Sequence, residues 1–381
     1  MNSAEFNVEN LNAERLKAIL VDVVPYNIDR GEAESNLDEL KSLVNTLGGI
    51  TIQKIIQKRN RPSAKTFLGE GKAMEVGQIA KTLRADVVIF NNILKPNQVM
   101  HLTAIFGKKV WDRVDLILKI FEKHAKTREA KLQIELARLY HEFPKLYGKG
   151  VSFSQQSSAG TRGGLSGVRG PGEKYLEQRK RALRRQIKIY EDDLAKIKKI
   201  RKNQRDIRKR RNLKTVAIVG YTNSGKSTLL KALTKKENVY IANKLFATLD
   251  TKIGDMFIPK YGKVLVADTI GFIKDLPPFL IKSFLATLEE VKDADMILHV
   301  IDISDPEVIK KIKIVDEILE NLDCKDKKRI NVLNKIDMVE DKIGKIKKKL
   351  PEGTVIISAL QRKGLETLIT KIGKILALIR Y

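Results

Sequence analysis

The first part of the chain alternates between short apolar runs and patterns of helical spacing. Residues 32–47 place apolar side chains three or four apart, and a second helix is predicted from Gly69 to Leu83. The apolar or alternating runs typical of strands are 18–24, 50–58 and 85–90. Strands and helices therefore alternate, which predicts a small parallel α/β domain that we place at residues 1–112.

The middle of the chain has the pattern of two long helices. Apolar positions recur at helical spacing from Leu116 to Phe143, and Pro144 is expected to end this helix. A second helix is predicted from Glu173, again with apolar steps of three and four. The segment between them, 144–172, holds eight glycines in 29 residues and is predicted to be a loop. We expect an antiparallel helical hairpin over residues 113–212.

From Leu213 onward, strand and helix patterns alternate again, which predicts a third, α/β domain over 213–381. It opens with the apolar strand TVAIV, a glycine-bounded loop and an amphipathic helix. In this context the loop matches a P-loop, whose backbone N–H groups surround a β-phosphate. Lys226 would reach the β- and γ-phosphates, and the Ser227 hydroxyl would coordinate Mg²⁺. The loop residues are Gly220, Tyr221, Thr222, Asn223, Ser224, Gly225, Lys226 and Ser227.

Two later segments bear on which base is bound. A buried strand is predicted to end at Asn334-Lys335-Ile336-Asp337. The Asp337 carboxylate can accept from guanine N1–H and from its exocyclic amine, whereas adenine offers no such pair of donors. Lys335 can cover the base, and Asn334 can tie this loop to the P-loop. The segment Ser358-Ala359-Leu360 can give a backbone N–H to the guanine oxygen.

Two further segments are candidates for contacts with the γ-phosphate. KVLVADTIGFI contains Asp268, which can hold Mg²⁺ through water, and Gly271, which can offer its N–H to the γ-phosphate; Thr269 and Ile270 lie between them. LFATLDT offers Thr248 as a second hydroxyl on Mg²⁺. Thr251 is the alternative, and the spacing does not choose between the two threonines. The remaining candidates of this segment are Phe246, Ala247, Leu249 and Asp250. Together these observations predict a GTP site in which Lys226, Thr248 and Gly271 contribute to hydrolysis.

The charge composition indicates that the protein also binds a polyanionic partner. The net charge is +27, and residues 173–212 contribute +11 of it, with 17 basic and 6 acidic side chains. Lysine and arginine bind phosphate backbones by displacing counterions, so a nucleic acid is the favoured partner of the second long helix. Its basic residues outside the apolar stripe are expected to remain free for a partner, and they include Arg184, Arg185, Lys188, Lys198, Lys199, Arg201 and Lys202.

Other features exclude several classes of protein. No apolar run approaches the roughly 18 residues of a membrane span, and the acidic N-terminus does not have the pattern of a signal peptide. Cys324 is the only cysteine, which excludes an internal disulfide, and the four histidines lack metal-ligand spacing. A cytoplasmic monomer without structural metal is the expected state.

The five nucleotide elements resemble the G1 to G5 motifs of Ras-like translational GTPases, and LFATLD with DTIGFI resembles the HflX family. GEGK with ADVVIFNNIL, the run from DRVDLILKIF to LARL, and GVRGPGEKYLEQRKR are similar to HflX segments as well. The family pattern has a hydroxyl where Val168 stands. An extra C-terminal domain that some members carry is expected to be absent or vestigial.

The resemblance implies a Mg²⁺-dependent GTPase that binds the large ribosomal subunit and its RNA and acts on ribosomes, including the splitting of stalled or stressed ones. Arg184, Arg185 and Lys188 are the RNA-binding candidates. An RNA-binding ribosome assembly factor regulated by GTP and GDP is the alternative. A metabolic P-loop kinase is disfavoured by the Asn334–Asp337 element. Phe272 occupies the place where Ras-like enzymes carry the glutamine that orients water, so slow intrinsic hydrolysis and stimulation by the ribosome are expected.

Overall fold

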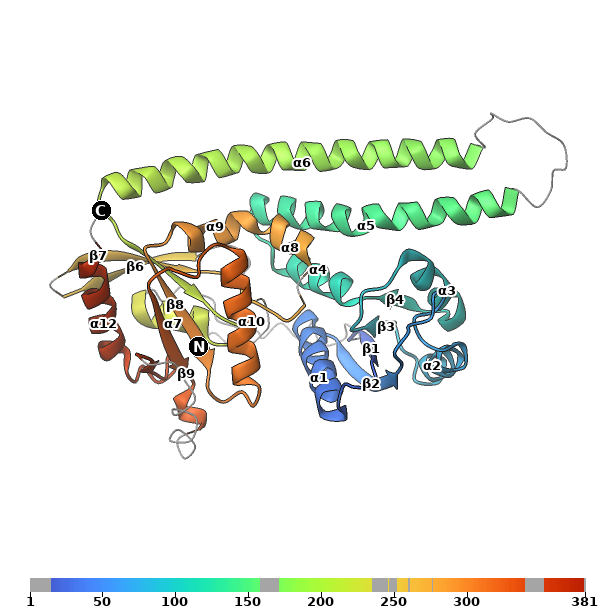
Figure 1. The fold of residues 1–381 in the computed structure, drawn as a ribbon, viewed down its shortest axis with the longest axis horizontal. Coiled ribbons are helices and arrows are strands. Elements are labelled where there is room, and N and C mark those ends of the chain that lie inside the picture. The colour runs from blue at the N-terminus through green and yellow to red at the C-terminus, as the bar shows by residue number, and fades with distance from the viewer. Residues whose placement is uncertain are drawn as a thin grey trace, which may run out of the picture. The chain divides into compact units, whose positions relative to one another are not determined.

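The computed structural model of the chain (Figure 1) describes the structure of the following residues: 15–157, 171–234, 246, 252–259, 261–275, 277–339 and 353–379. The chain forms two compact units. Unit 1 comprises residues 1–120 and 142–180, and unit 2 comprises residues 121–141 and 181–381. No helix in the described part of the chain is long and apolar enough to cross a membrane.

Unit 1 contains a parallel four-stranded sheet in the order β2-β1-β3-β4. Its strands are β1 (Lys17–Val24), β2 (Ile50–Lys58), β3 (Val87–Phe90) and β4 (Lys109–Trp111). Its helices include α1 (Arg30–Leu47), α2 (Glu70–Thr82) and α3 (Pro96–Phe106). The predicted parallel α/β fold is confirmed. The pattern missed β4, which has only three residues, and α3.

Local chemistry accounts for the bounds of α1. Asp29 is its N-cap, and the carboxylate accepts a hydrogen bond from the backbone N–H of Gly31 at 2.5 Å. The helix ends at Gly48, whose φ of 97° is left-handed and therefore suits glycine. Between these two caps, one face of α1 is buried within unit 1, and this face includes Leu37 and Leu40.

The helical middle of the chain differs from the prediction in two respects. It contains α4 (Arg113–His124), α5 (Arg128–Ser157) and α6 (Pro171–Arg210), so the first long helix is in fact two. Thr127 starts α5, because its hydroxyl accepts from the N–H of Ala130 at 3.1 Å and so acts as an N-cap.

The expectation that Pro144 ends the first long helix is also wrong, because α5 continues to Ser157. A proline removes one backbone donor, and the helical bonds on either side of it remain available. Residues 144–157 and 171–172 of the predicted loop are therefore helical, since α6 begins at Pro171. The segment 158–170 lies outside the described residues.

Within unit 2, α5 and α6 run antiparallel. The Tyr140 hydroxyl donates to the Glu191 carboxylate at 2.5 Å, and Arg201 pairs with Glu129 at 2.7 Å. Residues later in α5 thus meet residues earlier in α6. Burial, together with the bond to Glu191, raises the pKa of Tyr140 to about 12, so this hydroxyl keeps its proton.

Unit 2 contains a six-stranded sheet in the order β10-β9-β8-β5-β7-β6, in which β6 alone pairs antiparallel. The strands are β5 (Thr215–Val219), β6 (Lys252–Ile258), β7 (Gly262–Asp268), β8 (Met296–Asp302), β9 (Arg329–Asn334) and β10 (Val355–Ile356). The helical elements are α7 (Lys226–Thr234), α8 (Pro278–Ser283), α9 (Leu285–Asp293), α10 (Val308–Asn321), α12 (Leu365–Leu378) and the short 3₁₀ turn η1 (Ile336–Met338).

The carboxyl ends of β5, β7, β8 and β9 lie at one edge of this sheet because these strands are parallel. The predicted fold class, with an N-terminal parallel α/β part, a helical region and a C-terminal P-loop domain, is confirmed. The edge of the sheet brings together residues at the ends of four different strands: Gly220, Asp268, Asp302 and Asn334.

Candidate functional site

The P-loop joins β5 to α7 through backbone that requires glycine at two positions. Gly220 and Gly225 have φ values of 154° and 92°. A Cβ atom at Gly220 would overlap the carbonyl oxygen of Val300, and one at Gly225 would overlap the side-chain amide of Asn334. The neighbouring strand and loop therefore leave room only for backbone here, which is the close approach that a phosphate-binding loop needs.

Lys226 begins α7 and is almost fully buried, with 7% of its surface exposed. Its Nζ donates to the carbonyl oxygen of Tyr221 at 2.7 Å, so the ammonium lies within the P-loop. Burial lowers the pKa of Lys226 to about 8, while the Asp268 carboxylate raises it and the Lys335 charge lowers it further. A phosphate group would supply the negative charge that favours the ammonium form.

Ser227, a predicted ligand of Mg²⁺, lies next to Asp268, which is predicted to hold the ion through water. The Ser227 hydroxyl donates to Asp268 Oδ2 at 2.6 Å, and Asp268 is fully buried. A hydroxyl and a carboxylate that meet at one point are the hard oxygen donors that Mg²⁺ prefers, so the residues present fit this ion. The predicted second hydroxyl, Thr248, lies outside the described residues, as do Thr251, Ala247, Leu249 and Asp250.

The segment after β7 lies against the P-loop. Thr222 N–H donates to the Phe272 carbonyl at 2.7 Å, and Phe272 N–H donates to the Gly220 carbonyl at 3.1 Å. A Cβ atom on Gly271 would stand 2.9 Å from both Lys226 Nζ and Thr222 Cα. The backbone of Gly271 therefore lies close enough to the P-loop to contact a phosphate bound there.

The other predicted residues of this segment serve to hold it in place. The Thr269 hydroxyl donates to the carbonyl oxygen of Ile218 at 2.7 Å, and Ile270 is 5% exposed.

Tyr221 of the P-loop is buried, and its hydroxyl accepts from Lys274 N–H at 2.8 Å. The ring of Tyr221 also faces Lys311 of α10, whose Nζ lies 5.0 Å from the ring centroid. The Tyr221 side chain thus fixes the P-loop to its neighbours.

Asn334 connects three loops of the site. Its Nδ2 donates to the Ser224 carbonyl at 2.9 Å, and its Oδ1 accepts from Ala359 N–H at 2.9 Å. The P-loop, the loop after β9 and the loop after β10 are therefore tied through one amide. Asn223, which precedes Ser224, has a left-handed φ of 62°.

Asp337 lies in the 3₁₀ turn η1 and is half-buried. Its Oδ1 is buried and has no hydrogen-bond partner among the residues that the structure describes. A buried carboxylate oxygen is costly unless donors reach it, and the two adjacent N–H groups of guanine are donors of this kind. Ile336 N–H donates to the Ile357 carbonyl at 3.4 Å, which fixes the turn next to the loop after β10.

Lys335 is held by a residue that the sequence analysis did not select. Its Nζ pairs with Asp302 Oδ2 at 2.6 Å, and its backbone φ of 67° is left-handed. Asp302 is the last residue of β8, as Asp268 is of β7 and Asn334 of β9. A polar residue at the carboxyl end of an apolar strand was therefore a sequence signal that could have identified Asp302.

The loop after β10 contributes backbone atoms. Ser358 is fully buried, and its hydroxyl accepts from Gln361 N–H at 3.1 Å. Ala359 is 3% exposed, whereas Leu360 is 77% exposed. The backbone of Ala359 lies beside Asn334, which is where a guanine oxygen would be reached from this loop.

Phe246 has its side chain in a different place from the phosphate-binding residues. It is 3% exposed, and its ring packs edge-on against Phe121 of α4, with 4.7 Å between the centroids. Its φ of 54° is left-handed, which is uncommon for a residue with a side chain. Whatever Phe246 contributes to nucleotide binding therefore comes from its backbone.

His299 lies on β8 beside the end of β5, and no pattern in the sequence pointed to it. It lines a small pocket with Thr222 and Ser224, and its Nδ1 and both hydroxyls are buried without hydrogen-bond partners in the described part of the chain. Burial lowers the pKa of His299 to about 3, and the charges of Arg329 and Lys226 act in the same direction, whereas a hydrogen bond with Asn331 opposes it.

The neutral form of His299 should therefore persist to low pH. A pKa below the ordinary value of 6.5 means that its contribution to stability is complete above pH 6.5 and is lost as the pH falls toward 3, at about 1.4 kcal/mol per unit. We expect the imidazole NMR signal to keep its neutral shift from pH 8 to pH 4, with His299→Gln used to assign it. A midpoint near 6.5 in the folded protein would contradict this.

The basic residues of α6 fall into two groups. Arg184, Arg185 and Lys188 are exposed, and Lys188 approaches Asp192 at 3.9 Å. In contrast, Lys198 pairs with Glu289 at 2.6 Å and Arg201 pairs with Glu129 at 2.7 Å. The expectation that Lys198 and Arg201 are free for a partner is therefore wrong. Their acidic partners lie on other helices and could not be paired from the sequence of α6.

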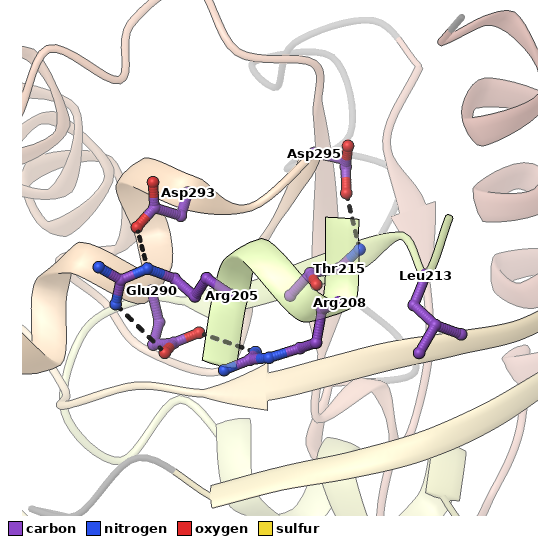
Figure 2. A pocket seen from close by; sticks show the side chains of 7 residues that line it. All are labelled: Arg205, Arg208, Leu213, Thr215, Glu290, Asp293 and Asp295. Carbon is purple, nitrogen blue, oxygen red and sulfur yellow. Dashed lines mark hydrogen bonds and ion pairs between the residues drawn. The ribbon is translucent and has the colours of Figure 1, made fainter. Parts of the chain in front are cut away.

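Figure 2 shows how the end of α6 is attached to α9. Arg205 is only 9% exposed, and its Nε pairs with Asp293 at 2.7 Å while its Nη1 lies 3.9 Å from Glu290. Arg208 reaches the same Glu290 at 3.4 Å. Asp295 accepts from the backbone N–H of Thr215 at 2.7 Å, so the start of β5 is fixed at this point too. Removal of one partner from a buried network of this kind typically costs about 3–5 kcal/mol.

Comparison with known families and structures agrees with this geometry. Residues 34–122 match the family described as GTP-binding GTPase N-terminal, and residues 124–208 match GTP-binding GTPase Middle Region. Residues 215–335 match the family described as 50S ribosome-binding GTPase. A crystal structure of SsGBP in complex with GDP is similar, with a TM-score of 0.51 and 27% identity, over 94% of this chain and 98% of that one.

The similarity to curated proteins extends over most of both chains. The GTPase HflX of Caldanaerobacter subterraneus subsp. tengcongensis is 41% identical over 370 residues, which are 96% of this chain and 82% of the relative. The GTPase HflX of Escherichia coli (strain K12) is 41% identical over 306 residues, 80% of this chain and 70% of its own. Since these relatives match the N-terminal part, the helical part and the P-loop domain together, the protein belongs to the HflX family of GTPases and hydrolyses GTP.

Proposed function

We propose that the protein binds the large ribosomal subunit in its GTP form and acts on ribosomes, including the splitting of stalled or stressed ones. In this proposal it works as a cytoplasmic monomer of three parts, residues 1–112, 113–212 and 213–381. The main support for ribosome binding is the exposed basic face of α6, which is formed by Arg184, Arg185 and Lys188. The same chain contains the GTP site. The match of residues 215–335 to the ribosome-binding GTPase family supports it.

The GTP site would work mainly by positioning and electrostatic stabilisation. The backbone N–H groups of the loop from Gly220 to Gly225 surround the phosphates. Lys226 offsets negative charge on the β- and γ-phosphates, and Gly271 N–H donates to the γ-phosphate. Asp337 accepts from guanine. Ser227 and Thr248 would hold Mg²⁺, with Asp268 acting through water, and the bound ion would supply positive charge beside the phosphate oxygens.

The basic face of α6 has the geometry of a phosphate-binding surface. Arg184 and Lys188 are four residues apart in a helix, and Arg185 lies three residues before Lys188, so the three side chains share one face. In unit 2 this face is held on a rigid support, because α6 is fixed to α9 by Arg205 and to α5 by Arg201. Cations on a rigid helix lose little conformational freedom when they contact RNA phosphates.

Sedimentation tests this proposal. The protein should co-sediment with purified large subunits in the presence of a nonhydrolysable GTP analogue, and much less with GDP. Incubation of intact ribosomes with GTP should then release free subunits. Binding to free precursor RNA without binding to mature subunits would favour the assembly-factor alternative instead, and equal binding with GDP and the analogue would contradict the nucleotide switch.

Charge reversal on α6 gives a sharper prediction. The triple variant R184E/R185E/K188E should bind large subunits more weakly and with a log–log salt dependence that is flatter by about 2–3, because each lost phosphate contact removes about 0.7–0.9 from the slope. GTP affinity should stay within about twofold. The matched control is K41E/K81E/R84E in unit 1, which changes the net charge equally at exposed positions. Equal losses in both variants would mean that only total charge matters.

A further inference from the structure

An ion pair connects the end of β8 to the residue directly after β9, at the edge of the sheet that also carries the P-loop. Lys335 Nζ lies 2.6 Å from Asp302 Oδ2, and the two side chains are only 22% and 18% exposed. Asp302 lies beside Asn334 in the parallel register of the two strands. We propose that Asp302 is a positioning residue for guanine nucleotide binding, which holds the Lys335 side chain in place to cover the base.

The Asp302 carboxylate is itself held in place by the turn after β8. Its Oδ1 accepts from the backbone N–H of Ser304 at 3.0 Å and from the Ser304 hydroxyl at 2.5 Å. Its Oδ2 therefore remains for the ammonium of Lys335. Ile303 N–H donates to the Asn334 carbonyl at 3.1 Å, so the backbone of this turn is also tied to the end of β9. Asp302 thus presents a fixed negative charge to Lys335.

The Lys335 side chain is held at both ends. Its backbone has a left-handed φ of 67°, which is unfavourable for a residue with a Cβ atom and persists only where the surroundings fix it. The side-chain amide of Asn334 gives support on one side, because it bonds to both the P-loop and the loop after β10. On the other side, Ile336 N–H donates to the Ile357 carbonyl at 3.4 Å. Since Nζ is paired with Asp302, the apolar stem between these points has little freedom to move.

The position of this stem suits one face of a nucleotide base. Lys335 precedes Asp337, the proposed acceptor of the guanine donors, by two residues, and its ammonium is paired at β8, which lies between β9 and β5. The pKa of Lys226 is lowered by burial and also by the charge of Lys335, so the two ammonium groups lie within electrostatic range of each other. A base bound at its edge by Asp337 then has the stem of Lys335 for one of its faces, because a lysine stem covers apolar surface while its ammonium stays paired.

The ion pair lowers the cost of that contact. A lysine side chain without a fixed partner has many rotamers, and binding that selects one of them costs conformational entropy. Asp302 has already selected the rotamer of Lys335, so nucleotide binding does not have to do so. An ion pair that served only the fold would leave nucleotide affinity unchanged when it is broken, which makes the two roles separable.

The variant D302N, which keeps the shape of the side chain, tests the role directly. Its amide oxygen can still accept from Ser304, whereas the neutral amide cannot balance the Lys335 ammonium. We expect D302N to bind GTP and GDP about 3- to 30-fold more weakly in equilibrium titration, since the released lysine has to be ordered on binding. The loss should appear in the GTP concentration at half-maximal rate, whereas the single-turnover rate at saturating GTP should stay within about twofold. Unchanged affinity would overturn the inference.

A double-mutant cycle shows whether Asp302 acts through Lys335. K335M keeps an apolar side chain but has no ammonium, so Asp302 has no charge to hold in this background. We expect D302N/K335M to bind GTP as K335M does, within about twofold. Losses that multiply in the double variant would mean that Asp302 acts by another route, and they would overturn the inference even if D302N alone binds GTP weakly.

The matched control is D316N, which breaks an ion pair at the opposite end of β9. Asp316 of α10 pairs with Arg329, the first residue of β9, at 2.5 Å. This variant makes the same chemical change and should leave the affinities for GTP and GDP within about twofold of those of the unchanged protein. Equal losses in D316N and D302N would show that affinity reflects only the general support of β9, and would contradict the role of Asp302.

This inference rests on the proposed recognition of guanine by the loop after β9, and D337N separates the two. If D337N shifts the preference from GTP to xanthosine triphosphate while D302N binds GTP and GDP normally, the base loop stands and the role of Asp302 falls. If D337N leaves the preference unchanged, the base loop is wrongly assigned, and both proposals fall together.

Discussion

Replacement of Asp337 by asparagine should lower GTP affinity by about 10²–10⁴-fold, because two hydrogen bonds to a charged group, each worth about 1.5–3 kcal/mol, are lost or reversed. The amide can instead donate to the extra carbonyl of xanthine, so affinity for xanthosine triphosphate should rise. The buried Asp337 Oδ1, which has no hydrogen-bond partner among the described residues, is the structural reason for choosing this residue. Equilibrium titration with both nucleotides measures the two effects.

Two controls make the result specific. D323N changes the same functional group at a position whose side chain is 89% exposed, and it should leave both affinities unchanged. K226A should weaken GTP and xanthosine triphosphate alike, since Lys226 lies in the P-loop and contacts no base. An unchanged preference for GTP in D337N would remove Asp337 from base recognition.

The sequence was enough to propose the nucleotide site because the chemistry of that site is local. The sequence pattern of a strand, a glycine-bounded loop and a helix identifies the P-loop within about a dozen residues. Asp268 and Asn334 each end an apolar strand, and parallel strands bring such residues to one edge of the sheet. The two glycines with positive φ stand where the pattern requires close backbone approach. Fold class followed from the same alternation of apolar strands and helices.

What the sequence did not reveal depends on contacts between distant residues. Arg205 and its partner Glu289 are 84 positions apart, so no pattern within α6 shows that part of its charge is used inside the molecule. The Phe121–Phe246 pair spans an even longer interval of sequence. The continuation of α5 past Pro144 was missed for a different reason, because a local rule about proline was applied without knowledge of what supports the helix.

Hydrolysis by the isolated protein should be slow, and large ribosomal subunits should accelerate it by about 10³-fold or more, because a supplied catalytic group gives about 10³–10⁵-fold in related phosphoryl transfers. The position after Gly271 holds Phe272, whose ring cannot donate to or accept from water. Phe272 is 2% exposed, and its backbone is bonded to Gly220 and Thr222. We therefore expect the group that orients the attacking water to come from a rearranged loop or from the ribosome.

Single-turnover hydrolysis at fixed salt, with and without purified subunits, measures this acceleration. A fast rate that subunits leave unchanged would contradict both the role given to Phe272 and a ribosome-activated switch. F272Q provides an independent check. Because the side chain at 272 points into an apolar cavity lined by Phe121, Phe246 and Phe284, the new amide would be buried without partners, at a cost of about 1–3 kcal/mol. We therefore expect F272Q to be less stable and no faster than the unchanged protein, since a glutamine placed there faces away from the phosphates.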